Sequence, residues 1–113
     1  MATLQKSFAA SRNADWEDDL QFVSGGAPVD LTGAVLAMDV AKLTGEKQLK
    51  LRLGDGLTIV DATAGTARIF VPRARMFGLP AGSYVHDLLI MRGTLVTRIW
   101  AGTLTVDEGV TDV

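Results

Sequence analysis

The stretch "LPAGSYVHDLLIM", residues 79–91, decides the fold that the sequence predicts. A glycine stands two places before a tyrosine, and a run of mostly apolar residues follows. This order is typical of a tyrosine corner, in which the tyrosine hydroxyl donates a hydrogen bond to the backbone a few residues upstream. Leu79, Pro80, Gly82 and Tyr84 fit the device. We therefore predict that the stretch opens the penultimate strand of an antiparallel sandwich.

The chain's one histidine, His86, stands beside Asp87 in the same stretch. Adjacent residues on a strand point to opposite faces, so this carboxylate cannot orient this imidazole as in a catalytic pair. The nearby serine also lacks the G-x-S-x-G elbow of a nucleophile. We predict no catalytic residue and no enzymatic activity. The role of His86 stays open.

The strand from Tyr84 to Met91 is apolar on both faces, apart from His86 and Asp87. A sandwich strand with one wet side should carry polar residues there. A loop, the N-terminal arm or another subunit must cover the second face, and we favour an assembly contact within a homo-oligomer. The predicted contact residues are Val85, Leu89 and Met91, with Phe70 and Val35 as neighbours across the sheet.

Period-two patterns recur along the rest of the chain, separated by glycine-rich turns. Asp55-Gly56 predicts a turn with positive φ at both residues. A change of apolar parity in the last strand predicts a bulge at Gly102. Pro72 and Gly78 predict a short helical turn near 73–78. We predict an all-β, immunoglobulin-like antiparallel sandwich of seven to nine strands over residues 15–113, preceded by an N-terminal arm or edge strand over 1–14.

Composition limits the classes of function. The 113 residues suit one domain. A net charge of −2 and a pI near 5.2 give no electrostatic basis for binding nucleic acid or an anionic membrane. The absence of cysteine excludes disulfides and thiolate metal sites. The N-terminus lacks a basic segment followed by an apolar one, so we expect no secretion signal. We expect no cofactor.

Two binding sites are weaker alternatives. Asp15, Glu17, Asp18 and Asp19 form an acidic cluster, but their spacing matches no calcium loop, so we predict no metal. Trp16 or Trp100 could instead carry a platform for a sugar, which makes a carbohydrate- or cell-surface-binding module the second hypothesis for function.

The order of landmarks resembles a known family. "VDLTGA" at 29–34 leads into a strand, "LPAGSYVHDLL" at 79–89 opens a later one, and "AGTLTVDEGVT" at 101–111 closes the chain. This looks like the immunoglobulin-like domains of phage and prophage structural proteins, and is similar in particular to the N-terminal domain of the phage baseplate upper protein. The matching positions are Asp30, Leu31, Thr32, Gly33, Gly82, Tyr84, Asp87, Leu88, Gly102, Val106, Val110 and Thr111. His86 departs from the pattern, which commonly has tyrosine there.

The resemblance implies a non-enzymatic component of a phage or prophage particle, from the tail, the baseplate or the head–tail region. Its partners would be further copies of itself and other phage structural proteins. It would be found in the virion, or in the host cytoplasm during assembly.

Overall fold

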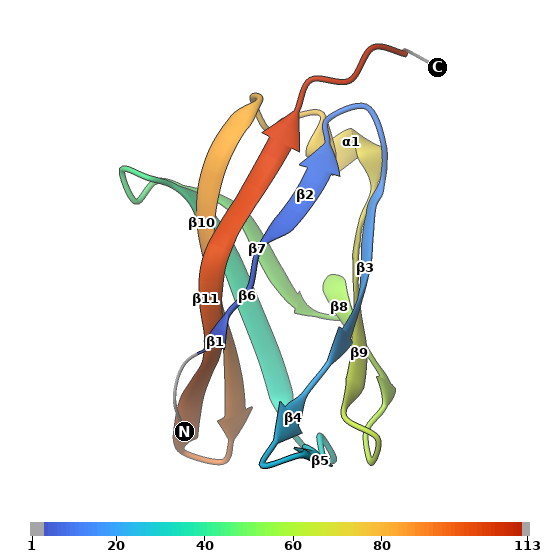
Figure 1. Cartoon of the computed structure of the whole chain (residues 1–113), viewed down its shortest axis with the longest axis vertical. Helices are drawn as coiled ribbons and strands as arrows, with labels where there is room; N and C mark the ends of the chain where they lie inside the picture. The colour runs from blue at the N-terminus through green and yellow to red at the C-terminus, as the bar shows by residue number, and fades with distance from the viewer. Residues whose placement is uncertain (1–3, 112–113) are drawn as a thin grey trace.

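A computed structural model describes residues 4–111 as a β-sandwich with one helical turn (Figure 1). The all-β fold and the helical turn predicted near 73–78 are confirmed. The elements in this part of the chain are β1 (Leu4–Gln5), β2 (Phe8–Ser11), β3 (Trp16–Gln21), β4 (Val23–Ser24), β5 (Ala27–Pro28), β6 (Val35–Lys42), β7 (Lys47–Leu53), β8 (Gly56–Asp61), β9 (Thr66–Val71), α1 (Arg73–Met76), β10 (Gly82–Arg92) and β11 (Leu95–Asp107). No helix among these residues is long and apolar enough to cross a membrane.

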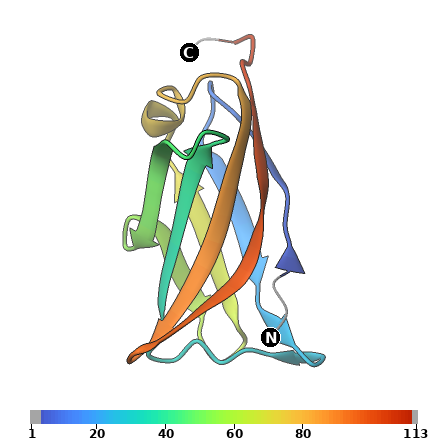
Figure 2. The ribbon, with the colours of Figure 1, turned by 90° about the vertical axis from the view of Figure 1, so that its left-hand side faces the viewer.

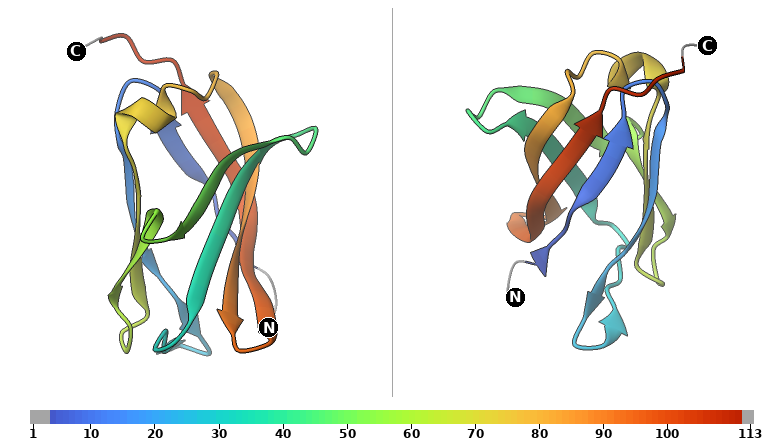
Figure 3. Two further views of the ribbon diagram at one scale, coloured as in Figure 1. Left: turned by 180° about the vertical axis from the view of Figure 1, so that it is seen from behind. Right: turned by 45° about the horizontal axis from the view of Figure 1, so that its top comes forward.

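Nine strands join into one hydrogen-bonded sheet that folds over into two layers (Figures 1 and 3). We call the layer of β1, β2, β11, β10, β6 and β7 the larger sheet, and that of β8, β9 and β3 the smaller sheet. Between β7 and β8 only two residue pairs connect the layers. β4 and β5 form a separate hairpin at one end.

The interior is filled by alternate residues of strands from both sheets. On β3, for example, Trp16 and Leu20 are buried, whereas Glu17 and Asp19 are exposed. Because successive strand residues point to opposite faces, this pattern was readable from the sequence. The fully buried side chains include Phe22, Leu20, Leu31, Leu36, Met38, Leu51, Leu57, Ile69, Met76, Leu88, Leu104 and Val40.

Leu31 closes the end of the sandwich near β4 and β5. The Asp30 carboxylate accepts hydrogen bonds from the amide of Thr32 at 2.9 Å and from its hydroxyl at 2.6 Å. This side-chain turn places Leu31 in the core, where its amide donates to the carbonyl of Ala62 at 2.8 Å. Gly33, at φ +73°, then turns the chain toward β6. The "VDLTGA" landmark is therefore a device of the fold.

The turn predicted at Asp55-Gly56 differs from the expectation. Positive φ values occur at Gly54 and Gly56, and Asp55 is not among the residues with positive φ. β7 and β8 pair in parallel there, so the segment does not close a hairpin. The chain is crossing from the larger sheet to the smaller one at this point, which the local dipeptide does not encode.

The bulge in β11 also lies elsewhere than predicted. Leu88 on β10 faces Trp100, whereas Leu89 faces Arg98, so Ile99 is the extra residue. Ile99 and Trp100 are consecutive and both buried, as expected where a bulge turns two neighbours to one face. The parity change was real, but Gly102 does not cause it.

Gly102 serves the docking of the N-terminal strands instead. β1 and β2 run parallel to β11, and the Lys6 amide between them donates to the carbonyl of Ala101 at 3.0 Å. A β-carbon on Gly102 would lie 1.8 Å from the Lys6 carbonyl oxygen. Glycine is required because a backbone passes directly over it.

Residues 1–14, predicted as an arm or edge strand, thus include two short strands of the larger sheet. Phe8 on β2 is buried in the core. Residues 1–3 of the predicted arm and 112–113 of the predicted domain lie outside the described residues. The boundary between residues 14 and 15 remains a prediction.

The segment 79–84 forms the predicted corner. The Tyr84 side chain is buried, and its hydroxyl donates a hydrogen bond to the Pro80 carbonyl. Leu79 is buried beside it, and Gly82, at φ +150°, begins β10. The hydroxyl is therefore engaged within the fold.

Replacing Tyr84 with phenylalanine should lower the free energy of unfolding by about 1 kcal/mol, because one hydrogen bond is lost while the ring remains. Urea denaturation measures this loss. Ser83→Ala, at the exposed neighbouring position, should leave the midpoint unchanged. Equal midpoints for Y84F and the unmodified chain would remove the stabilising role of the corner.

Gly102→Ala should displace the N-terminal strands and destabilise the chain by about 1–3 kcal/mol, since the added methyl group overpacks the site. Amide hydrogen exchange should accelerate in β1 and β2 before it does in β6 or β10. Thr105→Ala, an exposed position on the same strand, is the control. Unchanged exchange in G102A would contradict the proposed reason for the glycine.

Candidate functional site

The centre of the larger sheet is β10, which pairs with β6 on one side and β11 on the other. Its inward side chains are Tyr84, His86, Leu88 and Ile90, all buried. The outward set is Val85, Asp87, Leu89 and Met91, and Val85 is 38% exposed while the other three are half-buried. Both faces of β10 are thus mostly apolar, as the sequence predicts.

Val85, Asp87 and Leu89 of the outward set line a shallow groove on the outer face of the larger sheet. The strands of this sheet face the viewer in Figure 2. The groove has a volume of about 690 Å³ and crosses β6, β10 and β11. Its apolar floor contains Ala41, Val85, Leu89 and Ala101. The sequence allowed three covers for this face: a loop, the N-terminal arm or another subunit. Neither a loop nor the described part of the arm closes the groove. Gln5 on β1 is the one described residue of the arm that lines it.

Charged residues stand inside this apolar groove. Asp39 on β6 makes ion pairs with Lys47 at 2.9 Å and Arg52 at 2.7 Å. Burial opposes its ionisation, but hydrogen bonds from those two cations hold the pKa of Asp39 below its ordinary value. The side chain of Asp87, which is directly opposite Asp39 on β10, makes no ion pair or hydrogen bond with any described residue. The side chain of Arg98 on β11 makes none either.

Sequence reasoning missed Asp39 and Arg98. For Asp39, the available signal was its place in the middle of "AVLAMDVAKL", at the same parity as Val35. A charged residue at that parity indicates that this face of the strand does not belong to the core. Arg98 was hidden, because its face depends on the bulge at Ile99.

Two of the predicted contact residues lie on different sheets. Val35 faces Met91 across β6 and β10, as expected for a neighbour of the groove. Phe70 lies on β9, on the outer face of the smaller sheet, and is 42% exposed. Its prediction as a neighbour across the sheet is wrong, because β9 and β10 belong to opposite layers.

The tryptophan platform is contradicted by burial. Trp16 is 2% exposed and Trp100 is 3% exposed. The Trp100 ring stacks on Phe22 with centroids 5.0 Å apart, and Phe8 packs edge-on against Trp16 at 5.6 Å. Both indoles are core residues, so neither offers a flat surface to a sugar.

The remaining exposed rings give no such surface. Phe70 stands alone on its sheet, and Phe77 is covered by two guanidinium groups, from Arg12 at 4.9 Å and Arg73 at 5.2 Å. The aromatic residues of the described chain are thus mostly engaged inside it.

The acidic cluster is divided among separate partners. Asp15 accepts from the amide of Arg73 at 2.7 Å, Asp18 from the Trp16 indole at 2.7 Å, and Asp19 pairs with Arg68 at 2.9 Å. Nowhere among residues 4–111 do three or more metal-ligating side chains gather.

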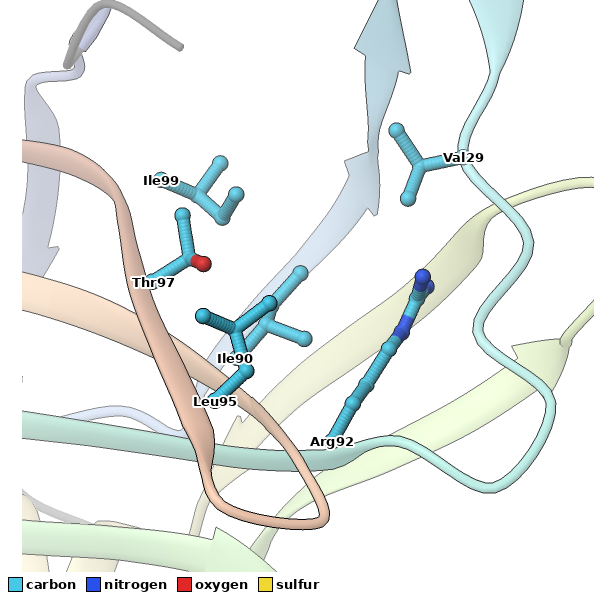
Figure 4. A pocket seen from close by; sticks show the side chains of 6 residues that line it. All are labelled: Val29, Ile90, Arg92, Leu95, Thr97 and Ile99. Carbon is cyan, nitrogen blue, oxygen red and sulfur yellow. The ribbon is translucent and has the colours of Figure 1, made fainter.

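A smaller apolar pocket lies at the end of the sandwich that holds the β10–β11 hairpin (Figure 4). Its volume of about 100 Å³ is the size of an aliphatic side chain, well below that of ordinary small-molecule sites. Arg92 crosses it and donates to the Asp30 carbonyl. Its lining consists of Val29, Ile90, Arg92, Leu95, Thr97 and Ile99.

His86 faces the interior and is 5% exposed. Its ring packs against Phe8 with centroids 5.2 Å apart, under the N-terminal strands. Neither ring nitrogen makes a well-formed hydrogen bond among the described residues. Burial lowers the pKa of His86, while backbone groups of Lys6 and Thr103 and the charge of Asp87 act in the opposite direction. Asp87 itself points to the outer face, as the strand geometry requires.

The solved structures that share this fold include two from different sources. The N-terminal domain of ORF48 from phage TP901-1 matches with a TM-score of 0.63 and 11% identity, over 91% of this chain and 86% of that one. CopC from Methylosinus trichosporium OB3b matches with a TM-score of 0.52 and 17% identity, over 96% of this chain and 89% of that one. Identities this low establish a common fold alone. No family model and no curated protein sequence matches the chain.

Stability should fall as the solution is acidified through the ordinary pKa of histidine, 6.5. Because the folded state lowers the pKa of His86, the unfolded chain binds more protons in this range. The stabilisation is complete above pH 6.5 and is lost progressively toward the lower folded pKa. Denaturation at about pH 8 and about pH 5.5 measures the loss. His86→Phe should remove most of this slope, and an unchanged slope in H86F would assign it to other groups.

Proposed function

We propose that the chain is a non-enzymatic structural component of a phage or prophage particle, from the tail, baseplate or head–tail region, that acts through protein–protein contacts. Two observations support this. The landmarks at 29–34, 79–89 and 101–111 resemble those of phage structural domains. The fold is also that of a domain from phage TP901-1.

The observation that carries the proposal is the open groove of the larger sheet. Half-buried Leu89 and exposed Val85 line the groove, and no described segment covers them. Half-buried Met91 and exposed Val35, which pair with each other, extend the apolar face beyond the groove. Leaving such a surface in water forgoes roughly 25 cal/mol for each Å² that a partner could bury. Apolar patches of this kind mark interaction sites.

A role without catalysis agrees with the surroundings of the titratable groups. The His86 ring is enclosed in the core, away from Asp87. The Tyr84 hydroxyl is bonded to Pro80. We propose that the partners are copies of the chain and other particle proteins, with no part for nucleic acid or membrane. The location would be the virion, or the host cytoplasm during assembly.

Purified particles of the phage or prophage that encodes the chain should contain it in fixed stoichiometry, as measured by quantitative peptide mass spectrometry. Leu89→Glu, supplied in trans to particles that lack the chain, should reduce its incorporation at least tenfold, because a carboxylate would be buried in an apolar contact.

Leu43→Glu is the matched control, since it makes the same change at a more exposed leucine on the β6–β7 turn. It should be incorporated normally. Particles without the chain would contradict the proposed function, and equal incorporation of both variants would contradict the assignment of the groove.

A further inference from the structure

Two opposite charges in the groove have no partner within the described chain. Asp87 is half-buried on the floor, and Arg98 is exposed on the neighbouring strand. Asp39, by contrast, is neutralised by Lys47 and Arg52. An ionised carboxylate in a largely apolar surface is costly to desolvate unless it is paired. A protein that covers this groove therefore binds best if it brings a cation to Asp87 and an anion to Arg98.

The two charges flank Leu89 in a particular arrangement. Arg98 is the register partner of Leu89 on β11, so it lies across the sheet from it. Asp87 lies two residues before Leu89 on the same face of β10, so it lies along the strand. Viewed from outside, the directions from Leu89 to the two charges are thus about perpendicular.

We propose that the groove binds a second copy of the chain in a face-to-face dimer with two-fold symmetry. Leu89 of one protomer packs against the partner's Leu89, and the strands of the two sheets cross at about 90°, one of the two arrangements that packed sheets adopt. A two-fold axis in the plane of the contact, bisecting the two directions, then places each Arg98 on the partner's Asp87 and each Asp87 on the partner's Arg98.

Charge complementarity selects a copy of the chain as the occupant. The same surface supplies both the anion that Arg98 lacks and the cation that Asp87 lacks, in an arrangement that a two-fold axis converts into two ion pairs. The outer face of the smaller sheet is a poorer candidate. Its Arg68 is already bonded to Asp19, and the adjacent Glu17 would repel Asp87.

The size of the face sets the expected strength. The molecule measures 24 Å along its shortest axis, across which the strands of the larger sheet are arrayed (Figures 1 and 2). Two such faces crossing at right angles overlap over an area on the order of 600 Å² on each copy, at the lower end for specific interfaces. We expect a reversible dimer whose population depends on concentration.

The dimer rests on the proposed function, because it specifies a partner for the same groove. Sedimentation velocity over a concentration series tests it on the full chain. The chain should shift from monomer to dimer with increasing concentration. Arg98→Asp and Asp87→Arg should each weaken this dimer on the order of 100-fold, because each places two like charges together in both ion-pair positions.

Mixing the two variants is the decisive step. R98D carries two acidic residues at these positions and D87R carries two basic ones, so the mixture should form a heterodimer with affinity near that of the unmodified chain. An ion pair within one protomer would give no such recovery. Formation of the heterodimer also establishes that both variants are folded. Arg68→Asp, the same charge reversal on the smaller sheet, should leave dimerisation unchanged.

Three results would overturn the dimer: an unmodified chain that stays monomeric at every concentration, single variants that associate as the unmodified chain does, or a mixture that stays monomeric. Loss of dimer in R68D would also overturn it, in favour of a contact between different faces. None of these results alters the detection of the chain in purified particles, so the dimer and the proposed function fail separately.

Discussion

The alternation of side chains along β10 is the constraint on which the rest of the structure depends. β10 pairs with β6 over eight residues and with β11 over eleven, so its orientation sets the faces of both neighbours. One face sends Leu88 into the core. The other sends Leu89 into the groove. A slip of one residue would exchange the two sets, placing Asp87 in the core. The Tyr84 hydrogen bond to Pro80, at the start of the strand, opposes such a slip.

The N-terminal strands complete the core rather than shield the outer face. Gly102 lets the backbone at Lys6 approach β11, and Phe8 then reaches the interior beside His86 and Trp100. This explains why a polar ring is tolerated at position 86, where it packs as a flat, neutral group among aromatic residues. The same packing makes the site sensitive to acid. It also leaves the groove without a cover from the described part of the arm.

What the sequence could predict was local. Faces along β3, β6, β7 and β10 follow from period two, and the corner at Tyr84 and the turn at Asp30 follow from residues a few positions apart. The predictions that failed depend on contacts between segments that are far apart in the sequence. The position of the bulge needed the register between Leu89 and Arg98, and the place of Phe70 needed the point where the chain changes sheets. The burial of Trp16 was suggested by its parity. The burial of Trp100 and the charges around Leu89 required the bulge to be located.

The edges of the two layers give further reason to look to the face for an assembly contact. β3 ends the smaller sheet with Glu17, Asp19 and a half-buried Asp18, and β7 borders the larger sheet with Lys47 and Lys50. Charged side chains on an edge strand oppose its pairing with another chain, because they would have to be desolvated or placed beside like charges. The groove has the opposite character, since its floor is apolar and its two free charges are of opposite sign. Unlike the edges at β3 and β7, it is therefore a surface on which burial and pairing of charge act in the same direction.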